Sequence, residues 1–177
     1  MSQQEIGRPA SDEYAPDFSR YVARVPETDI LSTLAKEKEE FLALLSGIPA
    51  NLVGYRYAEG KWSVRQVIGH VIDSERVFGY RALSIARSEQ SPLPGFDEAQ
   101  YADASSAEEA PLEELQREFA SLRESHELMF RHLSRGSWLR KGTANGFPVT
   151  ARALAYIIVG HARHHTAVLN ERYLLRP

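Results

Sequence analysis

The chain has 177 residues and a formal net charge of −3, and 43% of its residues are hydrophobic. This length and apolar content fit one globular domain and exclude a disordered chain. The 21 basic and 24 acidic residues leave no basic surplus for binding nucleic acid or an anionic membrane. Because cysteine is absent, a disulfide scaffold, a cysteine-ligated metal site and a thiol nucleophile within the chain are excluded.

The first 26 residues differ in character from the rest of the chain. They contain Pro9, Pro16 and Pro26 and show no helical periodicity, so residues 1–26 are predicted to form an arm that packs on the domain surface or on a partner. Residues 27–177 are predicted to form the domain itself. No signal peptide is apparent, and no apolar stretch approaches the ~20 residues that span a bilayer. We therefore expect a cytoplasmic protein that contacts neither membrane nor nucleic acid.

Helical periodicity dominates the remainder, and strand patterns are almost absent. Apolar residues recur at helical spacing in four segments. These predicted helices cover residues 28–46, 63–87, 111–134 and 150–174. Four helices, each with one apolar stripe, predict an all-α fold in the form of an antiparallel four-helix bundle. Residues 88–107 form a long predicted loop that could cross over the bundle, and residues 136–148 form another.

Three of the six histidines stand out by their positions. His161 and His165 are four residues apart on the last predicted helix, so their side chains lie about 40° apart and one turn along the axis. Both fall in the middle of its apolar stripe, near Leu154 and Ile157. Two core histidines bonded to carbonyl or carboxylate groups would explain such a pair, and so would two ligands of one metal ion. His70, at the edge of the apolar face of the second helix, could supply a third nitrogen, which gives the ligand number of a catalytic zinc-like site.

Several segments resemble those of one known family. Lys61–Arg76 (KWSVRQVIGHVIDSER) is similar to the second-helix signature of the DinB-like proteins, and Gly160–His165 (GHARHH) resembles their fourth-helix His-x-x-x-His signature. Pro92–Asp97 and Thr143–Gly146 are also similar to this family, and the resemblance covers residues 28–174. It implies a four-helix bundle of the DinB/YfiT type, often a homodimer. It also implies a divalent metal, zinc or nickel, held by His70, His161 and His165.

The resemblance also has implications for chemistry. Family members with known reactions are metal-dependent S-transferases that use low-molecular-weight thiols such as bacillithiol or mycothiol, and one related branch isomerises maleylpyruvate with a thiol cofactor. The resemblance therefore implies transfer of a thiol to an electrophilic small molecule. Because the chain lacks cysteine, the thiol must be a cosubstrate. The alternatives are a hydrolase with a metal-activated water, a non-catalytic metal-binding stress-response protein, and a bundle without metal.

Two carboxylates are candidates for catalytic roles. Asp73 lies one helical turn from His70 and could hold a ligand or a water, although an exposed helix carboxylate is an equally simple explanation. Glu75 lies near the middle of the apolar face and could orient a ligand imidazole. A buried ion pair with an arginine such as Arg76 or Arg152 is the alternative explanation for Glu75.

The candidates for substrate binding are three aromatic residues and one arginine. The guanidinium of Arg81 suits an anionic cosubstrate. It lies eleven residues from His70, about 16 Å along the helix axis, and would reach only the far end of a large substrate. The complete set of candidates is Trp62, Arg81, Tyr101 and Trp138.

The outer face of the last predicted helix has implications for assembly. Tyr156 and Val159 are predicted to be exposed there, where they would suit a helix of a second copy. Arg163 points away from the candidate metal ligands and is predicted to be solvated or to lie in a dimer interface. These positions favour a homodimer.

Overall fold

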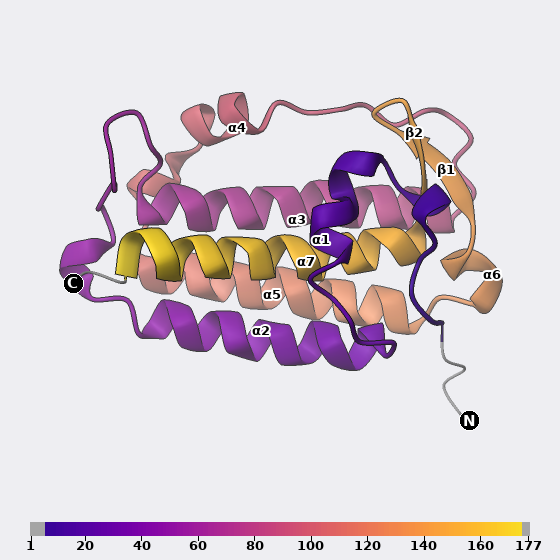
Figure 1. Cartoon of the computed structure of the whole chain (residues 1–177), viewed down its shortest axis with the longest axis horizontal. Helices are drawn as coiled ribbons and strands as arrows, with labels where there is room; N and C mark the ends of the chain where they lie inside the picture. Colours follow the sequence, from indigo (N-terminus) through magenta and orange to yellow (C-terminus); the bar gives the residue numbers. More distant parts are fainter. Residues whose placement is uncertain (1–5, 175–177) are drawn as a thin grey trace.

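The computed structural model describes residues 6–174. Its main feature is a set of four long helices that lie side by side and confirm the predicted four-helix bundle (Figure 1). They are α2 (Ile30–Ser46), α3 (Val64–Ala86), α5 (Leu112–Arg131) and α7 (Ala151–Val168), and a π-helical turn over Leu169–Leu174 extends α7. Their bounds lie within a few residues of the predicted ones because local signals start and stop them.

Side-chain caps explain where the two histidine-bearing helices begin. The Ser63 hydroxyl accepts a hydrogen bond from the Gln66 amide (3.2 Å), while Gln66 Oε1 accepts one from the Ser63 amide (3.0 Å). This reciprocal pair is a capping box that starts α3. Thr150 starts α7 by accepting a hydrogen bond from the Ala153 amide. Local sequence therefore sets the start of both helices.

The helices are not arranged as a simple up-and-down bundle. Both α2 and α3 pack chiefly on α5 and α7, so α2 and α3 lie diagonally opposite each other. The connection after α3 contains α4 (Glu98–Ala104) and a 3₁₀ turn (Ser106–Glu108), and it returns along the outside of the bundle (Figure 1). As a result, α3 and α5 run parallel, whereas α3 and α7 run antiparallel. This arrangement places one face of α3 directly against α7.

The segment between α5 and α7 has more structure than the sequence indicated. It forms α6 (Arg135–Trp138) and a hairpin of β1 (Lys141–Ala144) and β2 (Phe147–Thr150). The prediction of a loop over residues 136–148 was therefore wrong. Asn145 and Gly146 both adopt positive φ, 50° and 79°, which is the geometry of a tight two-residue hairpin turn.

Within the N-terminal segment (residues 6–26), residues 19–22 lie against α7 and residues 11–13 lie against β2, while residues 1–5 of the predicted arm fall outside the described residues. The described part consists of 3₁₀ turns over Ser11–Glu13 and Pro16–Phe18, followed by α1 (Ser19–Val22). Contact with α7 is very close at Gly160, where a Cβ atom would lie 2.0 Å from the Tyr21 carbonyl oxygen. Only glycine allows the two backbones to approach this closely.

This contact changes the character predicted for the outer face of α7. Tyr156 and Val159, predicted to be exposed, are fully buried, and the Tyr156 hydroxyl donates a hydrogen bond to the Glu27 carbonyl (3.0 Å). Arg163, predicted to be solvated or in a dimer interface, forms an ion pair with the Glu27 carboxylate (2.8 and 2.9 Å). The predicted exposure was wrong because a segment remote in sequence covers the helix. These residues therefore give no support to a homodimer.

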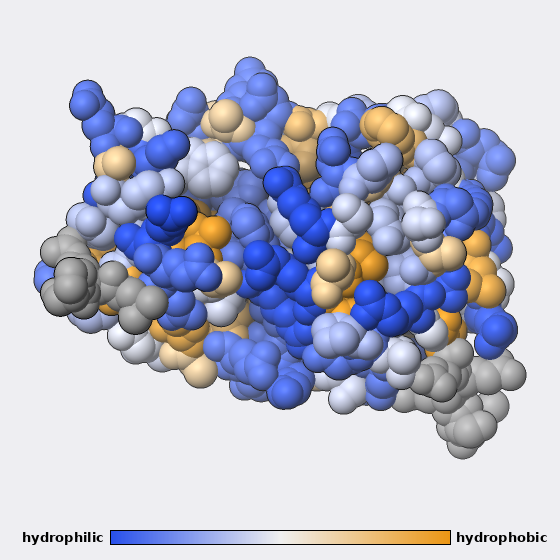
Figure 2. All heavy atoms as spheres, in the orientation of Figure 1, coloured by the Kyte–Doolittle hydropathy of each residue, from blue (hydrophilic) through white to orange (hydrophobic). Residues whose placement is uncertain are grey.

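The interior and the surface divide as expected for a water-facing bundle. Apolar side chains from all four long helices fill the space between them. The face formed by the N-terminal segment and α7 is mostly hydrophilic, with apolar side chains in small separate patches (Figure 2). Within residues 6–174, no helix is both long and apolar enough to traverse a membrane.

Candidate metal site

The packing of α3 on α7 brings His70, His161 and His165 together. One side-chain nitrogen from each histidine lies within 4.8 Å of those of the other two, and the Nε2 atoms of His70 and His161 are 3.1 Å apart. All three residues are buried, with exposed fractions of 5%, 3% and 9%. Among the residues that the structure describes, no carboxylate joins this cluster. The cluster therefore consists of nitrogen donors alone.

The N-terminal segment contributes an aromatic wall to the cluster. The ring of Tyr21 lies 5.2 Å from the ring of His161 and 5.6 Å from that of His164, measured between centroids. His164 in turn lies 4.9 Å from His165. Sequence reasoning missed Tyr21, because nothing in its local sequence indicates that it packs on a helix so far along the chain.

Burial keeps the three imidazoles neutral. It lowers the pKa of His70 to about 4, with a smaller contribution from the nearby His164. Burial, followed by the proximity of His70 and His164, lowers the pKa of His165 to about 2. Burial and the neighbouring histidines also hold the pKa of His161 well below its ordinary value. At neutral pH each ring therefore presents an unprotonated nitrogen, which is the form that binds a metal ion.

The donor set fits a divalent transition metal. Imidazole nitrogens suit both zinc and nickel, and three protein ligands leave a position at the metal for a substrate or a water. The Nδ1 atom of His165 is buried and has no hydrogen-bond partner within residues 6–174. Such a group is costly in a protein interior, and a bound ion would offer the site a partner.

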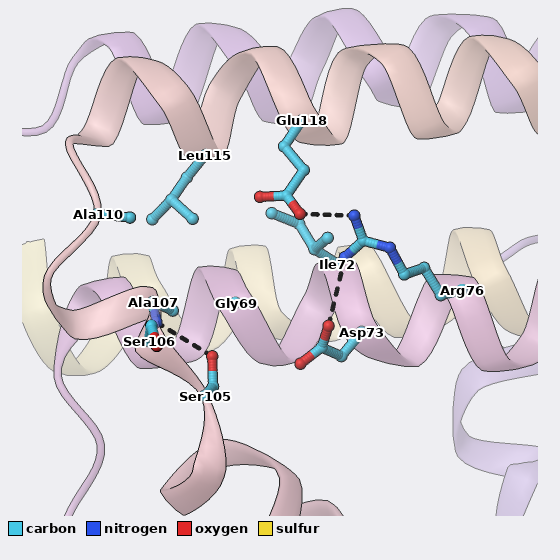
Figure 3. A pocket seen from close by; sticks show the side chains of 10 residues that line it. All are labelled: Gly69, Ile72, Asp73, Arg76, Ser105, Ser106, Ala107, Ala110, Leu115 and Glu118. Atoms are coloured by element: carbon cyan, nitrogen blue, oxygen red, sulfur yellow. Dashed lines mark hydrogen bonds and ion pairs between the residues drawn. The ribbon is translucent and has the colours of Figure 1, made fainter.

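Asp73 faces away from the histidine cluster. It lines a cavity of about 250 Å³ between α3, α5 and the segment that precedes α5 (Figure 3). There its carboxylate accepts a hydrogen bond from Arg76 (3.3 Å), and Arg76 also binds Glu118 (2.5 Å). Burial raises the pKa of Asp73 despite this partner. The structure does not bring Asp73 to the histidines.

Glu75 lies in the interior of the bundle, paired with Arg123 of α5. Arg123 Nε and Nη2 donate to the two Glu75 carboxylate oxygens at 2.7 and 2.8 Å. Arg123 also pairs with Glu37 of α2. The alternative explanation, a buried ion pair between Glu75 and an arginine, is therefore confirmed. The arginines suggested for it, Arg76 and Arg152, were wrong. The bidentate pair with Arg123 directs Glu75 toward α2 and α5.

The four substrate-binding candidates are spread over the molecule. Trp62 lies at the histidine cluster, with its ring centroid 4.8 Å from that of His70. Arg81 and Tyr101 line a different cavity, farther along α3. Trp138 is buried in α6, stacked on a phenylalanine of α5, at the end of the bundle opposite the start of α3 (Figure 1). The structure thus brings only Trp62 to the histidines.

A cavity of about 290 Å³ lies beside His165. Its walls include the aromatic rings of Tyr57, Trp62 and Tyr173 and the side chain of Lys61. A concave, largely aromatic surface with one cationic group suits a small organic molecule that carries a negative charge. This cavity gives such a molecule a place next to the histidine cluster.

The fold and the cluster together define a class of helical-bundle proteins with a candidate three-histidine metal site. The sequence profile of the DinB superfamily matches residues 33–169. This match covers most of the chain, and the chain therefore belongs to the DinB superfamily.

Two solved structures share the fold. One is YfiT from Bacillus subtilis, described as a probable metal-dependent hydrolase with an unusual four-helix bundle topology; its TM-score is 0.74 at 19% identity, over 95% of both chains. The other is the mycothiol-dependent maleylpyruvate isomerase, with a TM-score of 0.67 at 17% identity, over 82% of this chain and 61% of the isomerase. At these identities the likeness shows the fold alone. No curated protein matches the sequence.

Proposed function

We propose that the chain is a metal-dependent enzyme whose divalent ion, zinc or nickel, is held by His70, His161 and His165. The observation that carries the proposal is the burial of three imidazoles in one cluster that contains no carboxylate among residues 6–174. Burying three polar rings without a ligand costs free energy that apolar core residues would not cost. The description of YfiT as a probable metal-dependent hydrolase also supports the proposal.

The reaction that we favour is transfer of a low-molecular-weight thiol to an electrophilic carbon. A divalent ion held by three imidazoles supplies a Lewis acid that lowers the pKa of a thiol or of water. The chain has no cysteine, so the thiol enters as a cosubstrate of the bacillithiol or mycothiol type. Support comes from the structural neighbour that is named for its dependence on mycothiol.

Side chains around the cluster suit an anionic thiol cosubstrate. Lys61 lies in the wall of the cavity beside His165. Arg20 lies over the ring of Tyr21, 4.7 Å from its centroid, and donates a hydrogen bond to its hydroxyl (3.0 Å). These cations can bind carboxylates of the cosubstrate, while the aromatic walls exclude water from the thiol.

Hydrolysis is the second candidate reaction, and the description of YfiT favours it. A hydrolase benefits from a general base near the attacking water. The two candidate carboxylates are engaged elsewhere, Asp73 with Arg76 and Glu75 with Arg123. A thiolate is itself the nucleophile and needs no such base, so the geometry supports thiol transfer better. A non-catalytic metal-binding protein is the third candidate.

Elemental analysis of untagged protein, purified without a chelator, tests the metal site. We expect about one divalent ion per chain in the wild type, in line with a three-ligand mononuclear site. We expect the ion to be lost in His161→Ala and kept in His132→Ala, the matched control, because His132 is exposed. An absence of metal from the wild type, even after incubation with zinc and nickel salts, would contradict the proposal.

Conjugation assays then test the reaction. The metal-loaded chain is mixed with a panel of low-molecular-weight thiols and the electrophile monobromobimane, and the conjugate is quantified by fluorescence after separation. We expect conjugation faster than the uncatalysed rate in the wild type and in His132→Ala, but not in His161→Ala. Ester hydrolysis by the same samples without thiol would instead identify a hydrolase. Metal binding with neither activity would favour the non-catalytic alternative.

The homodimer implied by the family resemblance stays a prediction. The N-terminal segment covers the outer face of α7, so a second copy would have to use another surface. Light scattering of the purified chain measures its mass, and a mass of one chain would contradict the homodimer.

A further inference from the structure

The cavity lined by Arg81 and Tyr101 lies farther along α3 and is separate from the histidine cluster. Its volume is about 300 Å³. One wall comes from α3, with Val77, Tyr80 and Arg81, and the other comes from the long connection, with residues 93–96 and Tyr101. None of the three histidines lines this cavity. Its ligand chemistry is therefore independent of the metal site proposed above.

Arg81 is the feature of this cavity that requires explanation. It is only 4% exposed, yet no carboxylate within residues 6–174 forms an ion pair with it. Its Nη2 donates to the Pro94 carbonyl (2.7 Å), and its guanidinium carbon lies 5.7 Å from the centroid of the Phe96 ring. Arg76, the other cation in the cavity wall, already has two carboxylate partners. A buried cation without a counter-ion is costly, and an anionic ligand would offset that cost.

The wall opposite α3 is held in place without a ligand. Leu93 donates a hydrogen bond to the Thr143 carbonyl and accepts one from the Asn145 amide, both at 2.9 Å. Gly95 packs so closely on the hairpin that a Cβ atom there would lie 2.3 Å from Asn145 Oδ1. These contacts fix the connection against β1, so the cavity is already formed. A preformed site binds its ligand with little cost for ordering the protein.

The remaining walls indicate what kind of anion would fit. The rings of Phe96 and Tyr101 lie 5.2 Å apart, and Tyr80 is exposed at the edge of the cavity. Among the described residues, no acidic side chain lines the cavity. Since a protein cavity of about 150 Å³ can hold benzene, the space here accommodates one aromatic ring and a short acidic chain. We propose that this cavity binds a small aromatic carboxylate, with its carboxylate paired to Arg81 and its ring packed on Phe96 and Tyr101.

NMR titration of the whole ¹⁵N-labelled chain tests this proposal. Metal is first removed with a chelator, which is then dialysed away, so that carboxylates cannot coordinate an ion at the histidines. The probes are benzoate, phenylacetate and 3-phenylpropionate, each compared with its primary amide. We expect the best acid to shift the Gly95 amide resonance and to bind at least about tenfold more tightly than its amide, because charged hydrogen-bonding pairs are stronger than neutral ones.

Substitutions at Arg81 separate charge recognition from cavity shape. Arg81→Met removes the guanidinium and is expected to bind the acid no more tightly than the amide. Arg87→Met, at an exposed arginine just after the end of α3, is the matched control and is expected to keep the full preference. Arg81→Lys retains a charge without the planar fork, and it is expected to show a reduced preference for the acid. Circular dichroism checks that each variant is folded. If Arg81→Met does not fold, the comparison with Arg81→Lys still decides the test.

Three results would overturn the proposal. The first is equal binding of acid and amide by the wild type. The second is the absence of any response of Gly95 to the three acids at millimolar concentration. The third is an undiminished preference for the acid in folded Arg81→Met or Arg81→Lys, which would place the bound carboxylate at another surface.

Discussion

At the scale of single residues, the histidine cluster links metal chemistry to folding. Burial disfavours the charged form of an imidazole, so His70, His161 and His165 stay neutral in the folded chain. Neutral nitrogens are ready to bind a metal ion. The same rings are free to take up protons when the chain unfolds. The property that prepares the site for metal therefore also makes folding sensitive to acid.

The metal-free chain is expected to lose stability as the pH falls below about 6.5, the ordinary pKa of histidine. Above that pH both states leave the rings unprotonated. Below it, these histidines bind protons in the unfolded state. In the folded state, His70 stays unprotonated down to about pH 4 and His165 down to about pH 2. Each such histidine lowers the unfolding free energy by up to about 1.4 kcal/mol per pH unit in this window.

Urea unfolding at several pH values, in the presence of a chelator, measures this dependence. His165→Gln should reduce the slope of unfolding free energy against pH by about the contribution of one histidine. His132→Gln, at an exposed position, serves as the control and should leave the slope near that of the wild type. A wild-type stability that is flat between pH 7 and pH 5 would contradict the expectation.

At the scale of elements, the N-terminal segment completes the site and covers α7. Tyr21 of α1 packs on His161, while Tyr156 and Val159 lose all contact with solvent. This packing depends on Gly160, where the backbone of α1 approaches α7 so closely that a Cβ atom would lie 2.0 Å from the Tyr21 carbonyl oxygen. A short segment with little structure of its own thus becomes part of the wall around the candidate metal site.

Gly160→Ala is expected to destabilise the chain, although alanine favours helices over glycine by about 1 kcal/mol. The added Cβ would lie 2.0 Å from the Tyr21 carbonyl oxygen, so α1 must move away from α7. We expect a net loss of about 1–3 kcal/mol, typical of overpacking, and faster proteolysis of the N-terminal segment.

Thermal unfolding and limited proteolysis measure these effects. Gly136→Ala is the control, because the nearest atom to its added Cβ would be 4.0 Å away. An increase of stability in Gly160→Ala, with unchanged proteolysis, would show that α1 does not depend on this contact.

At the scale of the whole molecule, one buried charge network joins three of the four long helices. Arg123 of α5 pairs with Glu37 of α2 and with Glu75 of α3, and all three side chains are almost inaccessible to solvent. Burial works against the charge of Arg123, but the two carboxylates raise its pKa above the ordinary value. The network therefore has charges of both signs, and losing Arg123 would leave two buried carboxylates without the cation that they share.

Arg123→Met is expected to destabilise the chain by about 3–5 kcal/mol, because it leaves two buried carboxylates without their cation. Combining it with Glu37→Gln and Glu75→Gln should recover part of this loss, since no uncompensated carboxylate then remains in the network. Arg117→Met, at an exposed arginine of the same helix, should change stability by less than about 0.5 kcal/mol.

Chemical unfolding of the three variants measures these differences. A loss in Arg123→Met no larger than in Arg117→Met would show that the interior network contributes little. The triple variant combines Arg123→Met, Glu37→Gln and Glu75→Gln. If it is no more stable than Arg123→Met alone, the lost stability comes from packing around the guanidinium.

The sequence by itself determined the parts of this protein that depend on local patterns. Helical periodicity and capping residues predicted the four long helices, and the four-residue spacing of His161 and His165 placed them on one face of α7. Spacing also put His70 at the edge of the apolar face of α3. Short-range sequence was enough because a helix repeats every few residues and is started and stopped by its neighbours in the chain.

Only the tertiary structure decided which partners the other side chains meet. It directed Asp73 toward Arg76, paired Glu75 with Arg123, left Arg81 without a carboxylate partner among residues 6–174, and bonded Tyr156 to the backbone of Glu27. Most of these outcomes depend on segments that are far apart in the chain, such as the 48 positions that separate Glu75 from Arg123. Periodicity indicates which face of a helix is buried, but it contains no information about which distant segment buries it.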